Sequence, residues 1–114
     1  MEIEIKHKIW IESNGELLMG RGHAELLQAL LFDPSLTKAA KKVKISYSKA
    51  WKLMKLLNKK AEKPAVVMVP GGKKGGKTTI TPFGEKLLNH YWETHQKYLI
   101  FLREEVNQSH PTGD

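Results

Sequence analysis

The 114-residue sequence contains no cysteine, which excludes disulfide bonds and thiolate metal sites. It also lacks a long uninterrupted apolar run, so we expect no membrane-spanning helix. The N-terminus is charged and has neither the apolar stretch nor the small-residue cleavage site of a secretory signal. Apolar residues make up 40% and charged residues 27%, which is typical of one soluble domain with a modest core, and the cytoplasm is the expected location.

Patterns typical of enzymes and metal sites are missing as well. The five histidines lie far apart or at spacings that do not align on one helix face: His7, His23, His90, His95 and His110. We therefore expect no metal site. No Ser/His/Asp group or pair of carboxylates has a catalytic spacing, so we expect no catalytic residue, no cofactor and no enzyme activity.

Positive charge is concentrated in the middle of the chain. The segment Thr37–Lys77 holds thirteen of the nineteen lysines and arginines but only one of the twelve acidic residues, Glu62. This segment carries a net charge of +12, and the rest of the chain carries −5. A charge distribution this uneven suits a polyanionic partner such as DNA. The alternative is a lysine-rich face that is merely solvated.

The N-terminal third predicts a hairpin followed by a helix. Apolar residues alternate over Ile3–Ile11, which predicts a half-buried strand. Asn14-Gly15 is a strong signal for a tight turn into a second strand over Glu16–Met19. Leucines at helical spacing then predict a helix over residues 23–32, which Asp33-Pro34 ends.

Two further helices follow at short intervals. Ser35 is a plausible cap for a helix over Leu36–Val43, and Ser46 can cap the next helix. Lys44 occupies the turn between them, where a left-handed bend is needed and glycine is usual. The apolar face of the third helix is expected to consist of Tyr47, Ala50, Leu53, Met54 and Leu57.

The remainder predicts a second hairpin and a long helix. Strands are expected over residues 65–69 and 78–81, joined by a glycine- and lysine-rich tip. Pro82 suits the first turn of a helix capped by Thr81, which can run to about Val106 and leave 107–114 as a flexible tail. The order of elements describes a single α+β domain over 1–106: a winged helix-turn-helix with an N-terminal β-hairpin and a long C-terminal helix.

Five stretches of the sequence resemble one family of regulators. They are Arg21–Leu27, Ser35–Ala40, Ile45–Trp51, the wing Gly71–Lys77, and Ile80–Gly84. Together they resemble the N-terminal DNA-binding domain of the ModE family of molybdate-responsive regulators and, more distantly, LysR-type DNA-binding domains. The resemblance implies a transcription factor that binds DNA as a dimer. That family carries a C-terminal molybdate-binding module; since this sequence ends at Asp114, we expect a standalone form in which molybdate sensing is not implied.

A helix-turn-helix reads base edges with the exposed side of its second helix, while neighbouring groups contact phosphates. The residues expected to contact double-stranded DNA are Thr37, Lys38, Lys42, Ser46, Tyr47, Ser48, Lys49, Lys52, Lys55, Lys73, Lys74 and Lys77. Tyr47 and its neighbour Trp51 could also pack the helix against the wing, and we favour packing because aromatic residues at helical spacing usually belong to a core.

The wing contains a pattern that resembles a nucleotide-binding loop. Residues 71–78 satisfy G-x-x-x-x-G-K-[ST] and follow a predicted strand. A phosphate-binding loop must lead into a helix whose N-terminus faces the phosphates. Here the β-branched residues 78–81 and Pro82 follow instead, so we expect no nucleotide as partner.

The last helix predicts a homodimer. Spacings of three and four residues, typical of a coiled-coil seam, relate Leu88, Tyr91, His95, Tyr98 and Leu102. A symmetric dimer would place two reading helices about one duplex turn apart on a roughly palindromic site. The sequence thus predicts a homodimeric, sequence-specific transcriptional regulator. The alternatives are a nonspecific architectural DNA-binding protein, a nucleotide-binding enzyme, and an interaction module that has lost DNA binding.

Overall fold

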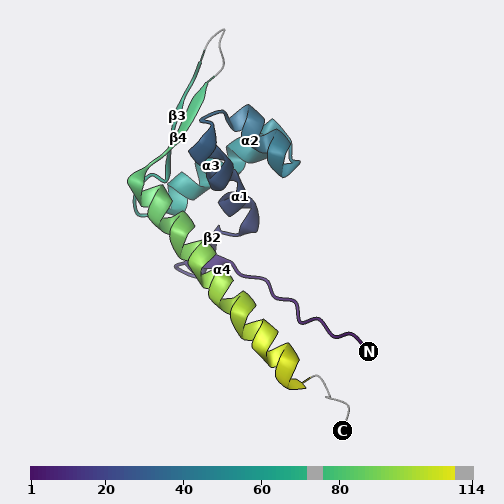
Figure 1. Cartoon of the computed structure of the whole chain (residues 1–114). Coiled ribbons are helices and arrows are strands. Elements are labelled where there is room, and N and C mark those ends of the chain that lie inside the picture. The colour runs from purple at the N-terminus through teal and green to yellow at the C-terminus, as the bar shows by residue number, and fades with distance from the viewer. Residues whose placement is uncertain (72–75, 110–114) are drawn as a thin grey trace.

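The computed structural model describes residues 1–71 and 76–109 (Figure 1). Its strands are β1 (Ile11–Ser13), β2 (Glu16–Met19), β3 (Val66–Val69) and β4 (Lys77–Ile80), and its helices are α1 (Arg21–Phe32), α2 (Leu36–Val43), α3 (Tyr47–Lys60) and α4 (Pro82–Ser109). β1 pairs with β2 and β3 with β4, both antiparallel. Helices α2 and α3, followed by the β3–β4 wing, form the expected α+β winged helix-turn-helix.

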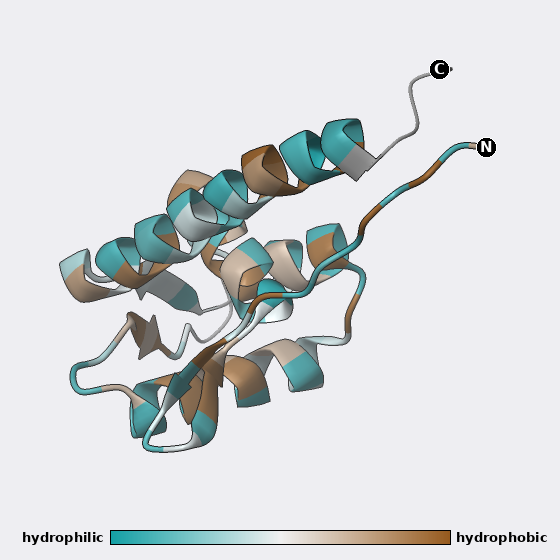
Figure 2. Cartoon of the chain, turned by 90° about the horizontal axis from the view of Figure 1, so that it is seen from below, coloured by the Kyte–Doolittle hydropathy of each residue, from teal (hydrophilic) through white to brown (hydrophobic). Residues whose placement is uncertain are grey.

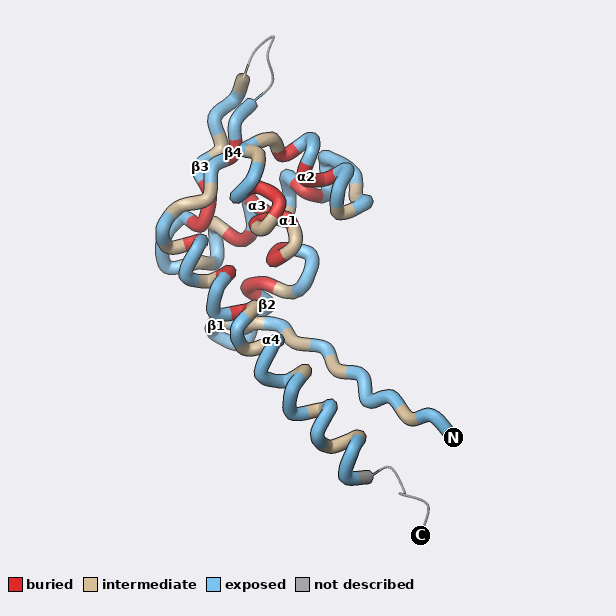
Figure 3. The backbone as a smooth tube through the Cα atoms, viewed as in Figure 1, coloured by how far each residue is buried: buried red, intermediate tan, exposed pale blue. Residues whose placement is uncertain are grey.

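The core lies where α1, α2 and α3 meet the base of the wing and the first half of α4 (Figure 3). Leu26 and Leu27 of α1, Met54 and Leu57 of α3 and Leu88 of α4 are at most 1% exposed. Removing these side chains from water stabilises the body of the domain. The second half of α4 leaves this body, and the molecule is accordingly elongated, with extents of 67, 30 and 20 Å.

The N-terminal strand is much shorter than the alternation predicts. The turn itself is as expected, because Asn14 and Gly15 both have left-handed φ angles, 54° and 77°. β2 has only four residues before the chain enters α1, so residues 1–10 have no strand to pair with among the described residues. This N-terminal segment runs extended beside α4 instead (Figure 1).

The helix-turn-helix follows the predicted local pattern. The Ser35 Oγ accepts a hydrogen bond from the Lys38 N–H at 3.2 Å, and the Ser46 Oγ accepts one from the Lys49 N–H at 3.1 Å. Lys44 has φ 66° and ψ 42°, the left-handed bend expected of the turn. These caps satisfy amide groups that each helix start would otherwise leave unpaired.

Three predictions about helices are corrected. α1 begins at Arg21 rather than at residue 23, and α4 continues to Ser109, so residues 107–109 are helical rather than part of a tail. Residues 110–114 lie outside the described residues. Tyr47 does not belong to the apolar face of α3: it is 52% exposed, whereas Met54 and Leu57 are fully buried.

Candidate nucleic-acid interface

Most of the expected DNA-contacting residues lie exposed on α2, α3, their helix caps and the wing. The exposed ones are Thr37, Lys38, Lys42, Ser46, Tyr47, Ser48, Lys49, Lys52, Lys55 and Lys77. The expected contacts Lys73 and Lys74 lie outside the described residues. We call these exposed residues together the lysine face.

Three exposed lysines in the first half of α3 have no acidic neighbour among the described residues. In residues 1–71 and 76–109, no carboxylate lies within 4.0 Å of the ammonium groups of Lys49, Lys52 or Lys55. Lys38 of α2 does pair with Asp33, at 3.2 Å between Nζ and Oδ2, but the pair is exposed and therefore weak. The positive charge of Lys49, Lys52 and Lys55 is thus left uncompensated, as a surface that attracts phosphates requires.

The wing is fixed to the helix-turn-helix by hydrogen bonds at its base. The Thr78 N–H donates to the Pro34 carbonyl at 2.8 Å. At the end of α3, the Asn58 side chain donates to the Val66 carbonyl at 2.8 Å and accepts from the N–H groups of Ala65 and Val66 at 2.8 and 3.1 Å. Sequence reasoning missed Asn58, although a single asparagine among the lysines and leucines at the end of α3 was the available signal.

Tyr47 and Trp51 lie beside the wing, and neither is buried in the core. They are 52% and 42% exposed, and they line a notch of about 450 Å³ between α3 and the wing. The Lys55 Nζ stands over the Trp51 ring, 5.3 Å from its centroid, which is a cation–π distance. The aromatic pair therefore belongs to the lysine face.

The nucleotide-loop pattern lacks its structural context. Lys77 and Thr78 are the first residues of strand β4, which pairs with β3, and not of a helix. A helix N-terminus facing the phosphates, on which such a loop depends, is therefore missing at this place. Among the residues that the structure describes, no group of three His, Cys, Asp or Glu side chains could hold a metal ion.

Two residues of the expected dimer seam are buried within the chain itself. Leu88 and Tyr91 are 1% and 2% exposed in the core, so their assignment to a dimer surface is corrected. His95 and Leu102 are half-buried and Tyr98 is 49% exposed, because this part of α4 lies beyond the body. Burial lowers the pKa of His95, and nearby His7 and Arg21 lower that pKa further.

No helix within the described ranges is both long and apolar enough to cross a bilayer.

Sequence comparison relates this chain to three named proteins. It is 36% identical over 86 residues to the molybdenum transport protein ModE of Azotobacter vinelandii, covering 73% of this chain and 32% of that protein. It is 40% identical over 73 residues to the molybdenum-pterin-binding protein MopB of Rhodobacter capsulatus, covering 64% and 27%. It is 36% identical over 80 residues to the transcriptional regulator ModE of Haemophilus influenzae, covering 59% and 31%.

These relatives confirm the resemblance to the ModE family over the part of the chain that they match. The chain spans about a third or less of the length of each relative. No family model matches. Among solved structures, the chain shares its fold with a mutant form of Lactococcus lactis ZitR, with a TM-score of 0.62, 21% identity, and coverage of 90% of this chain and 71% of that one.

Proposed function

We propose that this chain, which is related in sequence to proteins named ModE, is a DNA-binding transcriptional regulator that binds a roughly palindromic duplex site as a homodimer. The observation that carries the proposal is the lysine face, because it presents the reading helix of a winged helix-turn-helix with uncompensated positive charge. The name of the Haemophilus influenzae relative, transcriptional regulator ModE, supports the same conclusion.

Within this proposal, residues of α2 and α3 have two roles. Ser48, Lys49 and Lys52 lie on the exposed side of the first two turns, where a helix in the major groove meets base edges. Lys38, Lys42 and Lys55 flank them and contact phosphates, which position the protein without specifying sequence.

A nonspecific architectural protein is the second candidate, and one observation favours it. The first two turns of α3 contain no Arg, Asn or Gln, the side chains that make bidentate contacts with bases. The asparagine further along, Asn58, is occupied with the backbone of the wing. Selection of bound fragments from a random DNA pool separates the candidates, since a regulator enriches a discrete, roughly palindromic site and an architectural protein enriches none.

The role of α3 is tested by removing two of its charges. The double substitution Lys49→Ala and Lys52→Ala should weaken binding to the selected site roughly 10- to 100-fold and lower the salt slope by about 2. The matched control removes two exposed lysines from outside the lysine face, Lys8→Ala with Lys86→Ala, and should change affinity little. Equal effects of the two double variants would show that net charge, rather than the reading helix, governs binding.

Homodimerisation is supported by apolar surface at the far end of α4. Tyr98, Ile100 and Phe101 are about half exposed, and Leu102 lines a groove of about 710 Å³ between α4 and the N-terminal segment. Brown, apolar stretches mark both elements as they run toward the termini (Figure 2). Covering this surface with a second copy would remove it from water, and sedimentation equilibrium tests whether the chain is a dimer.

A further inference from the structure

The notch between α3 and the wing, about 450 Å³ in volume, is a hollow on the lysine face. It separates the first turns of α3, with Tyr47, Trp51 and Lys55, from the ends of β3 and β4. Thr37, at the start of α2, closes it from a third side. None of its described lining residues is acidic, so the notch has the charge of a site for an anionic group.

Buried residues and closely packed backbone form the floor and the wing side of the notch. Leu36 and Thr78 on its floor are each only 4% exposed, and the Thr78 N–H is bonded to the Pro34 carbonyl at 2.8 Å. On the wing side, a Cβ added at Gly76 would lie 2.7 Å from the Val69 carbonyl oxygen. Glycine, which lacks a Cβ, therefore allows the chain just before β4 to lie this close to the end of β3.

An indole and a cation lie side by side at the notch. Trp51 keeps 42% of its surface in water, although an aromatic ring gains more from burial than most side chains. The Lys55 Nζ stands 5.3 Å from the centroid of that ring. A sugar–phosphate unit matches this pair, because its sugar offers C–H groups to an aromatic ring and its phosphate offers charge to an ammonium group.

We propose that the notch seats one sugar–phosphate segment of duplex DNA where a strand passes between α3 and the wing. The deoxyribose lies against Trp51, and the adjoining phosphates meet the Lys55 ammonium and the Thr37 hydroxyl. This inference rests on the proposed DNA-binding function and adds to it a positioning role for Trp51, which fixes the register of α3 in the groove. A protein segment is the competing occupant.

Intrinsic fluorescence and affinity together test the proposal on the full chain. Titration with the selected duplex should change the Trp51 emission, which is obtained by subtracting the signal of Trp51→Phe from that of the unsubstituted chain. Trp51→Ala should weaken binding about tenfold with an unchanged salt slope, and Trp51→Phe should retain most of the affinity. Lys55→Gln should lower the salt slope by about 1.

Leu17→Ala is the matched control for truncation, because Leu17 is 48% exposed on β2 and does not line the notch. It should leave affinity unchanged, and circular dichroism should show each variant folded. If the duplex binds but Trp51 emission stays constant and Trp51→Ala binds as tightly as the unsubstituted chain, the notch proposal is wrong while the proposed function stands. If no duplex binds the unsubstituted chain, the proposed function fails first.

Discussion

The two ends of this molecule expose different chemistry. The lysine face, on α2, α3 and the wing, presents ammonium groups around one aromatic notch. The opposite end is formed by the N-terminal segment, the start of α1 and the second half of α4. It holds both arginines of the chain, Arg21 and Arg103, and half-exposed Tyr98, Ile100 and Phe101. One surface suits a hydrated polyanion, and the other suits the exclusion of water by another protein surface.

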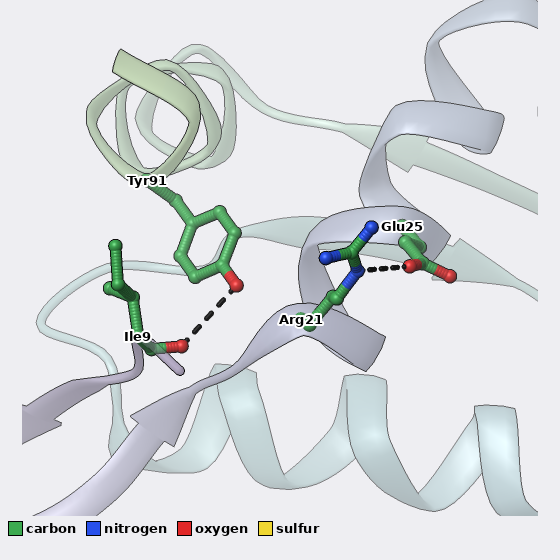
Figure 4. Close-up of polar contacts among 4 residues, drawn as sticks. All are labelled: Ile9, Arg21, Glu25 and Tyr91. Carbon is green, nitrogen blue, oxygen red and sulfur yellow. Dashed lines mark hydrogen bonds and ion pairs between the residues drawn. The ribbon is translucent and has the colours of Figure 1, made fainter. Parts of the chain in front are cut away.

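The ends also differ in how fully their polar groups are satisfied. The lysine face rests on capped helices and a wing anchored by backbone hydrogen bonds. At the other end, Tyr91 donates to the Ile9 carbonyl at 3.3 Å and Arg21 pairs with Glu25 at 2.8 Å (Figure 4). Yet the buried His7 Nε2 and Trp92 Nε1 have no hydrogen-bond partner within the described residues. The second end therefore keeps two unsatisfied polar atoms in its interior, whereas the helix starts of the lysine face are capped.

The largest effect is expected where the two ends join, at Gly84 in the first turn of α4. A Cβ at this position would overlap the Ala65 carbonyl oxygen, which also accepts a hydrogen bond from the Thr81 N–H at 2.9 Å. Gly84→Ala should therefore destabilise the fold by about 3 kcal/mol, measured by denaturant unfolding, because backbone rather than a side chain must move.

Gly22→Ala is the control for this substitution. A Cβ at Gly22, also in a helix, would meet nothing within 4 Å, so alanine should stabilise the fold by about 0.5–1 kcal/mol. Similar stabilities for the two variants would contradict the close approach of α4 to the base of the wing, and with it the fixed placement of the two ends.

The next largest effect should separate the ends by function. Phe101→Glu places a charge on the 52% exposed apolar surface of α4 and should raise the dimer dissociation constant roughly 30-fold or more, as measured by sedimentation equilibrium. Asn89→Glu adds the same charge at an exposed position nearer the body and should have little effect. A dimer that Phe101→Glu leaves intact would place the interface elsewhere.

The fold was largely predictable because local rules decide most of it. The caps Ser35 and Ser46, the left-handed Lys44 and the Asn14-Gly15 turn each specify their own conformation. The length of the first strand was not predictable, because alternation over residues 3–11 does not say how long its partner is, and β2 has only four residues.

The same limit applies to the candidate site. Helical spacing placed Tyr47 with Met54 on one face, but periodicity does not reveal that an open notch lies between Tyr47 and the wing and leaves Tyr47 52% exposed. In α4, one 3–4 spacing links Leu88 to Tyr98, yet Leu88 lies against the body and Tyr98 lies beyond it. In both cases the sequence pattern does not show how far the neighbouring element extends along the helix.

The loss of folding stability at acid pH should arise from the body and the second end of the molecule rather than from the lysine face. His23 at the start of α1 accepts the Gly20 N–H on its Nδ1 at 3.0 Å, which requires a neutral ring. Burial lowers the pKa of His23 below its ordinary 6.5, and the charge of Lys60 lowers that pKa further. Since the unfolded chain binds the proton more readily, this contribution to stability is complete above pH 6.5 and is lost as pH falls below it.

His23→Gln tests this assignment. Glutamine can accept the same N–H from this third helical position, so the variant should lie within about 1 kcal/mol of the unsubstituted chain at about pH 7.5. Below about pH 6 the glutamine variant should lose less stability, measured by thermal unfolding across pH. Parallel pH profiles would mean that His23 is not the group that titrates.

The smallest effect concerns the backbone of the lysine face itself. Lys44 adopts φ 66°, a conformation that costs a side chain about 1 kcal/mol relative to glycine, and its own side chain is exposed. Lys44→Gly and Lys44→Ala remove the same charge, but only glycine adopts this φ angle without strain. The free energy of unfolding of Lys44→Gly should therefore be about 1 kcal/mol higher than that of Lys44→Ala. Both should weaken DNA binding equally, because the turn is already set by the caps on either side. If Lys44→Gly instead bound DNA more weakly than Lys44→Ala, a side chain at position 44 would itself help to hold α3 in its reading position. The caps Ser35 and Ser46 would then not be enough to set the turn.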